Sequence, residues 1–194
     1  TWPNQVWTVD FKGWFRTRDG QRCDPLTVAD LYSRYVLEVR AVPEPSYGPT
    51  RRVFERLFAA RGLPEMIRCD NGGPFAAARA GGLSRLSAWW WRLGIQVEYI
   101  SPGHPEQNGA HERMHLTLKQ DTAQPPAANR RAQQRRMNCW QRQFNEVRPH
   151  EALDMQTPCD WYRPSERRYA GTPPLPPYPA GWAVRRVRPS GEIK

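Results

Sequence analysis

The chain has 194 residues, which is long enough for one hydrophobic core with a small appendage. Its formal net charge of +10 indicates a polyanionic partner, with nucleic acid as the first expectation and a merely solvated basic surface as the simpler alternative. The absence of a long apolar run and of a signal-peptide pattern excludes a membrane-spanning helix and predicts a soluble, intracellular protein. The four widely spaced cysteines form no C-x-x-C pair, which disfavours a structural zinc site or a disulfide framework.

The N-terminal part of the chain predicts a three-stranded antiparallel meander. Val6–Phe15 is rich in β-branched and aromatic residues, which is typical of a strand. An Asp-Gly turn signal then favours an antiparallel return, and Leu26–Leu31 and Tyr35–Val42 supply two further strands. Asp10 lies within the first strand, where a charge is costly unless it is paired or binds a metal. A surface aspartate on an edge strand is the alternative.

Helices and strands alternate in the next part. The expected elements are a helix over Pro49–Arg61, a strand over Pro64–Cys69, a helix over Leu83–Leu93 and a strand over Ile95–Ile100. Asp70 directly follows a strand and precedes a glycine turn, which is where α/β sheets place ligand-binding groups. An ordinary Asx turn is the alternative. The order of elements predicts an α/β fold, a mixed five-stranded sheet flanked by helices on both faces.

The segment Ser101–Lys119 combines a loop rich in proline and glycine with a helix that starts at about Ala110. This helix carries Glu112 between His111 and His115, and the letters HERMH fit the H-E-x-x-H pattern of zinc peptidases. In that interpretation the two histidines bind zinc and the glutamate is the general base. In the other interpretation, Glu112 is the last of three carboxylates that hold Mg²⁺.

The C-terminal part is basic and then rich in proline. Arg130–Val147 predicts a second helix with five arginines, which either line a phosphate track or are simply solvated. A strap with a short helix near Pro158–Tyr162 follows, and a proline-rich run from Thr172 predicts an extended linker with a basic hairpin fragment after it. The chain opens at Thr1 rather than at Met, so we expect a piece of a longer protein.

The three acids Asp10, Asp70 and Glu112 lie within a strand, at a strand end and on a later helix, positions that a mixed α/β core can bring together. Carboxylates packed against one another repel, so they are stable as anions only with cations between them. Mg²⁺ takes oxygen ligands from a few carboxylates and completes its shell with water and phosphate oxygens. Two such ions activate a water or a 3′-hydroxyl and stabilise the leaving oxygen of an in-line displacement.

Three motifs occur in the order VWTVDFKG, CDNGGPF and SPGHPEQNGAHERMHLTLK, and together they resemble the integrase catalytic core. The resemblance is closest to D-D-E transposases of bacterial insertion sequences, with retroviral integrases as more distant relatives. The strap that follows the helix predicted over Arg130–Val147 also resembles the tail that follows the core in those transposases. The resemblance implies a ribonuclease-H-like fold and a metal-dependent enzyme that cleaves DNA ends and joins them to target DNA (DNA integration, DNA recombination). Asp10, Asp70 and Glu112 would be the catalytic metal ligands for two Mg²⁺ or Mn²⁺ ions. The 41 residues between the last two acids exceed the usual spacing, and AAARAGGLSR holds the extra length.

The resemblance also implies an organisation and a set of partners. We expect a ribonuclease-H-like core in residues 1–125, a basic helix and strap packed on it in 126–170, and a proline-rich linker and basic tail in 171–194. The expected partners are the element ends and target DNA, with a homo-oligomer, no membrane, and a bacterial cytoplasmic, nucleoid-associated location. The candidate DNA contacts on the helix face of Glu112 and in the neighbouring loops are Asn71, His104, Gln107, Asn108, His115 and Lys119.

Two other functions stay open from the sequence. One is a zinc metallopeptidase through His111-Glu112-x-x-His115, although its longer pattern needs Gly at 118 and His at 121, where this chain has Leu118 and Asp121. That interpretation also leaves the basic charge and CDNGG unexplained. The second alternative is a non-catalytic DNA-binding module, which the presence of all three acids disfavours.

Overall fold

The computed structural model describes residues 2–77, 82–101, 109–174, 180, 181 and 183. The strands are β1 Val6–Phe11, β2 Phe15–Arg16, β3 Arg22–Asp30, β4 Val36–Val42, β5 Met66–Cys69 and β6 Gln96–Tyr99. The helices are α1 Tyr47–Arg61, α2 Arg85–Arg92, α3 Gly109–Ala123, α4 Arg130–Glu146, the 3-10 helix η2 Glu151–Leu153 and α5 Pro158–Trp161. In the described part, no helix is both long and apolar enough to cross a membrane.

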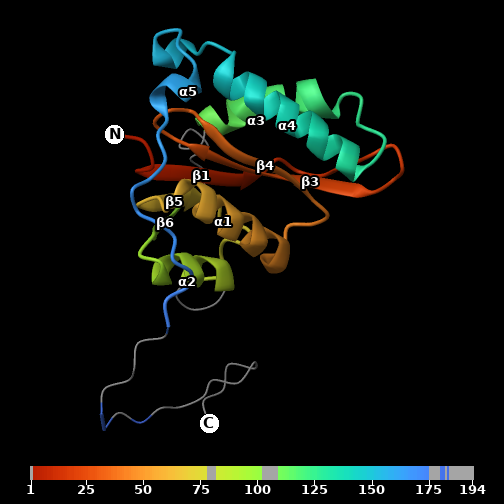
Figure 1. Cartoon of the computed structure of the whole chain (residues 1–194). Coiled ribbons are helices and arrows are strands. Elements are labelled where there is room, and N and C mark those ends of the chain that lie inside the picture. The colour runs from red at the N-terminus through yellow and green to blue at the C-terminus, as the bar shows by residue number, and fades with distance from the viewer. Residues whose placement is uncertain (1, 78–81, 102–108, 175–179, 182, 184–194) are drawn as a thin grey trace.

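The strands form one mixed sheet in which β4 pairs with β3, β3 with β1, β1 with β5, and β5 with β6. The pairs of β3 with β1 and β4 are antiparallel, whereas β5 runs parallel to both β1 and β6. Helices α3 and α4 cover one face and α1 and α2 the other (Figure 1). The predicted α/β fold, a mixed sheet with helices on both faces, is therefore confirmed, and the five strands in these pairs are joined by the short strand β2.

The first predicted strand was too long. It ends at Phe11, and Phe15–Arg16 forms the separate short strand β2 against β3. Gly13 between them has a φ of 88°, a left-handed backbone conformation that interrupts a strand and that glycine adopts without steric cost. The sheet therefore has one more short strand than expected.

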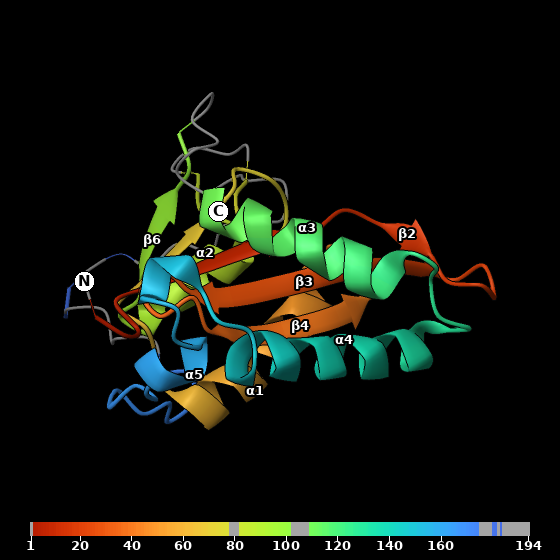
Figure 2. The same cartoon turned by 90° about the horizontal axis from the view of Figure 1, so that it is seen from above.

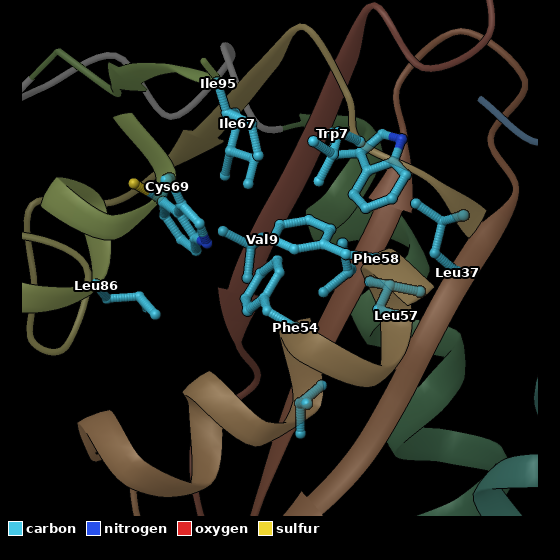
Figure 3. Packing of buried hydrophobic residues seen from close by; sticks show 14 of the residues in the cluster. Trp7, Val9, Leu37, Phe54, Leu57, Phe58, Ile67, Cys69, Leu86 and Ile95 are labelled. Atoms are coloured by element: carbon cyan, nitrogen blue, oxygen red, sulfur yellow. The ribbon is translucent and has the colours of Figure 1, made fainter. Parts of the chain in front are cut away.

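The larger hydrophobic core lies between the sheet and the pair α1 and α2 (Figure 3). Trp7 and Val9 point into it from β1 because alternate residues of a strand face the same side. Phe54 and Phe58, one helical turn apart on α1, meet them, and the Phe54 ring lies edge-on to Trp90 of α2 at 4.8 Å. Burying each such side chain contributes about 1.5–3 kcal/mol. Asp10 is thereby assigned to the opposite face of β1, the face that α3 and α4 cover.

On that opposite face, α4 also protects the free edge of the sheet (Figure 2). Asn145 accepts a hydrogen bond from the backbone nitrogen of Val36 and donates one to its oxygen, at 2.8 and 2.9 Å. Gln134 donates to the oxygen of Val39 at 2.7 Å, and Gln141 to the oxygen of Val36 at 2.8 Å. These amides satisfy backbone groups that an edge strand would otherwise expose to other chains.

The strap that follows α5 packs against the end of α1. Tyr162 stacks on Tyr35 with ring centroids 4.4 Å apart, and the backbone nitrogen of Leu63 donates to the oxygen of Arg167 at 2.7 Å. A side chain at Gly62 would begin 2.7 Å from the backbone oxygen of Ser165. The chain passes here too closely for any residue but glycine. The predicted linker and hairpin fragment after it fall mostly outside the described residues.

Candidate active site

Asp10 and Asp70 lie at the carboxyl ends of neighbouring parallel strands. In the pairing of β1 with β5, Val9 is opposite Cys69, and each aspartate is the next residue along its chain. Parallel register therefore places the two carboxylates at one edge of the sheet, where α/β folds place their ligand-binding groups. The structure thus shows the expected proximity of Asp10 and Asp70.

The pKa of the Asp10 carboxyl reflects its proximity to Asp70. Burial, followed by the negative charge of Asp70, raises the pKa of the Asp10 carboxyl to about 7. The charge of Glu112 raises it further, whereas the backbone hydrogen bond of Phe11 and the charge of Lys12 act in the opposite direction. An acid held as an anion against two other acids is stabilised by a cation. The donor chemistry at this edge therefore fits a hard divalent ion.

The turn after Asp70 passes close to that carboxylate. A Cβ at Gly72 would lie 3.0 Å from Oδ2 of Asp70, so a side chain there would displace the carboxylate by a few tenths of an ångström. Asn71 donates from its amide to the backbone oxygen of Ile100 at 2.8 Å, which fixes the turn to the end of β6. The Asn71 side chain thus orients the turn, and because it is exposed it stays a candidate for DNA contact.

Glu112 lies in the first turn of α3 and is exposed. Leu116 and Lys119, about one and two turns later on the same stripe, are exposed as well, and Leu116 is 59% accessible. Across the described ranges, no three His, Cys, Asp or Glu side chains are arranged to hold a metal ion. The structure thus brings Asp10 and Asp70 together, and it leaves Glu112 near enough to act on Asp10 electrostatically but outside a common ligand set.

The two histidines beside Glu112 point into the protein, against the sheet. Nε2 of His111 and Nε2 of His115 lie 2.7 and 2.6 Å from the same hydroxyl oxygen, Oγ1 of Thr27 on β3. Nδ1 of His111 lies 2.8 Å from Oγ1 of Thr8 on β1. The two imidazole rings meet edge to face at 4.6 Å. Two strands and one helix are thus joined by a buried polar network.

The hydrogen-bonding capacity of Thr27 assigns the protons in this network. Its hydroxyl has one proton, which it donates to the backbone oxygen of Asp10 at 3.0 Å, since a carbonyl can only accept. Both histidines must then donate from Nε2. In the neutral His111 ring, Nδ1 can only accept, so the Thr8 hydroxyl donates to it at 2.8 Å in preference to the backbone oxygen of Ala29, which lies 3.3 Å away. Burial lowers the pKa of His111 to about 3 and that of His115 to about 2, so both rings are neutral. The 3.8 Å contact between Nδ1 of His115 and Oδ2 of Asp10 is therefore not an ion pair.

The network overturns one expectation and removes the support for another. His115 is only 4% exposed, so it is not a DNA contact; its place on the helix turns it toward the sheet rather than toward solvent. The zinc-peptidase interpretation is not supported, because the Nε2 atoms that would bind zinc both contact Thr27 and Glu112 faces away from them. The chance match of HERMH to a zinc motif has a structural explanation: positions i and i+4 are the buried face of α3.

Sequence reasoning missed the two threonines, since an ordinary threonine in a strand carries no signal by itself. Only the pairing of β1 with β3, in which Asp10 is opposite Thr27, brings them under α3. Lys119 is exposed and stays a candidate DNA contact. His104, Gln107 and Asn108 lie outside the described residues.

Comparison with known proteins supplies the family. A family profile described as integrase core domain matches residues 1–105, and a second profile with the same description matches residues 93–158. The chain belongs to the integrase core domain family. This family is of the polynucleotidyl transferase kind, and neither the peptidase nor the non-catalytic alternative finds support in these matches.

Individual proteins with similar sequences include a bacterial insertion-element protein and a retroviral polyprotein. The chain is 28% identical over 160 residues to the insertion element IS407 uncharacterized 31.7 kDa protein of Burkholderia multivorans, covering 82% of this chain and 55% of that protein. It is 28% identical over 118 residues to the Gag-Pol polyprotein of baboon endogenous virus, covering 61% of this chain and 6% of the polyprotein. The chain thus spans about half of the bacterial relative and a small part of the viral one.

Solved structures share the fold. The HTLV-2 integrase catalytic core domain in complex with magnesium aligns with a TM-score of 0.65 at 16% identity, covering 84% of this chain and 98% of that one. The catalytic core domain of BIV integrase aligns with a TM-score of 0.61 at 20% identity, covering 82% of this chain and 93% of that one. At these identities the likeness establishes the ribonuclease-H-like α/β fold of integrase cores.

Proposed function

We propose that this core cleaves a phosphodiester at the end of a DNA element and then joins the freed 3′-hydroxyl to target DNA, in a reaction that depends on divalent metal. The observation that carries the proposal is the adjacency of Asp10 and Asp70 at the carboxyl ends of β1 and β5. Family membership and the raised pKa of Asp10 support it. The bacterial relative named as an insertion-element protein favours a transposase over a viral integrase.

Asp10, Asp70 and Glu112 are the residues that would hold two Mg²⁺ or Mn²⁺ ions. Such ions, when bound, supply an activated water or 3′-hydroxyl and stabilise the leaving oxygen. Asp10 contributes a carboxylate that is partly protonated near neutral pH and is set by strand pairing. Glu112 contributes an exposed carboxylate in the first turn of α3, and its side chain would turn toward Asp10 when metal and DNA bind.

The remaining residues position these acids and the substrate. Thr27 fixes the backbone of Asp10 and the buried face of α3 at once, so that the strand and the helix carrying the two acids keep one relative orientation. DNA is the proposed substrate, bound through the basic surface by phosphate contacts. Asn71 and Lys119 are proposed to contact it, together with His104, Gln107 and Asn108. A homo-oligomer is the proposed assembly.

The test is strand transfer by the 194-residue chain on a labelled DNA end with Mg²⁺ or Mn²⁺. Glu112→Gln should abolish product while DNA binding in EDTA stays within about twofold of wild type, because phosphate contacts dominate binding. Glu44→Gln is the matched control and should keep activity, since Glu44 is an exposed acid in the segment between β4 and α1. Activity that survives Glu112→Gln would exclude the assignment.

A second measurement keeps the proposal testable if the chain needs further segments for activity. Binding of Mn²⁺ followed by electron paramagnetic resonance should show ions on the wild-type chain, and Asp70→Asn should weaken that binding at least about tenfold, since it removes one anionic ligand. Asp70 is exposed at the end of β5, so this variant is expected to fold. Equal Mn²⁺ binding by both proteins would contradict the proposed metal site.

A further inference from the structure

A second site lies on the other side of α3 from Glu112. A cavity of about 690 Å³ opens between the start of α3, the β3–β4 turn and the segment that follows α4. Figure 2 shows that segment returning beside the beginning of α3. The cavity is bounded by polar and apolar groups of β1, β3 and α3, including Thr8, Ala29 and Met114. We call it the arginine cavity, after Arg34, Arg113 and Arg148, which also line it.

The three arginines come from separate segments and have no anionic partner. Within the described ranges, none of their guanidinium groups makes a hydrogen bond or an ion pair. Arg113 and Arg148 are exposed, and Arg34 is half-buried. Such an arrangement concentrates positive charge at one place and leaves all of its donors available to a ligand.

The charges lie close enough to repel one another. Burial lowers the pKa of Arg34, and the charge of Arg113 lowers it further. Burial also lowers the pKa of His150, with the charges of Arg148 and Arg34 acting in the same direction. Nε2 of His150 is buried without a hydrogen-bond partner. Cations that repel across a cavity, beside an unsatisfied imidazole nitrogen, are stabilised when an anion enters.

The acids that line the cavity do not neutralise it. Asp30 is fully buried, and its carboxylate accepts hydrogen bonds from the backbone of Asn4 at 2.7 Å and from the backbone and hydroxyl of Ser33 at 2.8 and 2.6 Å. Its charge acts on Arg34 only at a distance. Glu151 is exposed on η2. The lining therefore keeps an excess of positive charge.

The backbone of Arg34 adds an independent observation. Its φ is 61°, in the left-handed region that most side chains avoid and that glycine adopts at no cost. Strained backbone of this kind is concentrated at binding sites. Here this backbone conformation lies in the turn between β3 and β4, and the turn places Arg34 at the lining of the cavity.

We propose that the arginine cavity binds a backbone phosphate of the DNA substrate through Arg34, Arg113 and Arg148. A planar guanidinium matches the oxygens of a phosphate in a bidentate manner. Two of the three arginines are exposed, so a polymer that cannot enter the cavity can still place one phosphate in it. Arg113 directly follows Glu112, so the first turn of α3 would place an acid near the phosphodiester that is cleaved and a cation near the DNA strand beside it. The proposal deepens the proposed function and rests on it.

The test measures binding of a fluorescently labelled DNA duplex by anisotropy, with the full chain in EDTA and over a series of salt concentrations. Arg148→Gln should weaken binding about tenfold at low salt and reduce the slope of log affinity against log salt by about one. Arg34→Gln should do the same. Arg56→Gln is the matched control, since Arg56 is exposed on α1 on the other face of the sheet and loses the same charge. It should change affinity less than about twofold.

A further variant distinguishes DNA binding in the arginine cavity from a general effect of net charge on DNA binding. Ala152→Trp places a large neutral side chain on η2 at the lining and should weaken binding without altering net charge. If Arg148→Gln and Ala152→Trp both bind DNA as Arg56→Gln does, the proposal is wrong. Inorganic pyrophosphate is the competitor: if it occupies the cavity while DNA binding stays unchanged, the site takes a free anion and the DNA assignment fails. If the proposed function is wrong but the cavity binds DNA, the wild-type chain should show no strand transfer, while Arg148→Gln and Ala152→Trp still bind DNA more weakly than Arg56→Gln does.

Discussion

Thr27 donates a 3.0 Å hydrogen bond to the backbone oxygen of Asp10, its partner across β1 and β3. The same hydroxyl accepts from Nε2 of His111 and Nε2 of His115. One side chain thereby joins the strand of the first acid to the helix of the third. Because a buried donor that loses its partner keeps its full desolvation cost, this junction is sensitive to the loss of a single oxygen.

Thr27→Val keeps the shape of the side chain and removes its hydroxyl. Two buried imidazole N–H groups then lack acceptors, so the free energy of unfolding should fall by about 1–3 kcal/mol for each orphaned donor. Urea denaturation measures this. Thr117→Val is the control, because the Thr117 hydroxyl bonds only to the oxygen of Met114 in its own helix. Equal stability of the two variants would contradict the assigned network.

Metal chelation distinguishes this network from a zinc site. Because both Nε2 atoms face Thr27, phenanthroline or EDTA should leave the melting temperature of the purified chain within about one degree, whereas removing structural zinc unfolds a zinc-dependent domain. Differential scanning fluorimetry with and without chelator makes the comparison. One equivalent of bound zinc, lost together with stability, would restore the zinc interpretation.

Asp10 should make the metal-free chain less stable as pH rises. Its pKa is 3.8 in the unfolded chain and about 7 in the fold, so the folded form holds the proton more tightly. Below pH ~4 both forms are protonated and the group has no effect. Between pH ~4 and pH ~7 Asp10 ionises in the unfolded chain but stays protonated in the fold. The free energy of unfolding therefore falls over this range by an amount of the order of a few kcal/mol and then levels off.

Asp10→Asn isolates this contribution. The difference in unfolding free energy between variant and wild type, measured in EDTA, should be small near pH 4 and should favour the variant at pH 8. Addition of Mn²⁺ at pH 8 should stabilise the wild type and not the variant, because an ion offsets the repulsion among the acids. A difference that is independent of pH would show that Asp70 and burial do not raise this pKa.

The fold and part of the site were predictable because their signals are local. Period-two and helical patterns identified the elements, and the Asp-Asn-Gly-Gly run identified Asp70 at a strand end. The register that places Asp10 beside Asp70 and opposite Thr27 is a property of strand pairing and is not visible in either segment alone. The DNA contact predicted for His115 is wrong for the same reason. The i, i+4 spacing of His111 and His115 indicates that they share one face of the helix, and only the sheet packed against that face shows that it is buried.

The same difference between local and tertiary information applies to two glycines with positive φ. Gly20 has a φ of 80° with open space around it, whereas Gly62 has a φ of 78° and faces the strap, where a Cβ would lie 2.7 Å from the oxygen of Ser165. Gly20→Ala should therefore cost only the backbone term of about 1–2 kcal/mol. Gly62→Ala should cost that term and a further ~2 kcal/mol or more for displacing the strap.

Urea denaturation of both variants measures the difference, and limited proteolysis locates it. In Gly62→Ala the strap beyond Tyr162 should be cleaved faster than in wild type, since its backbone hydrogen bonds to Leu63 and Arg61 are lost when it moves away. In Gly20→Ala the strap should keep its protection, because that turn lies far from it in the fold. If both variants lose equal stability and neither exposes the strap, the close approach at Gly62 does not hold the strap to the core.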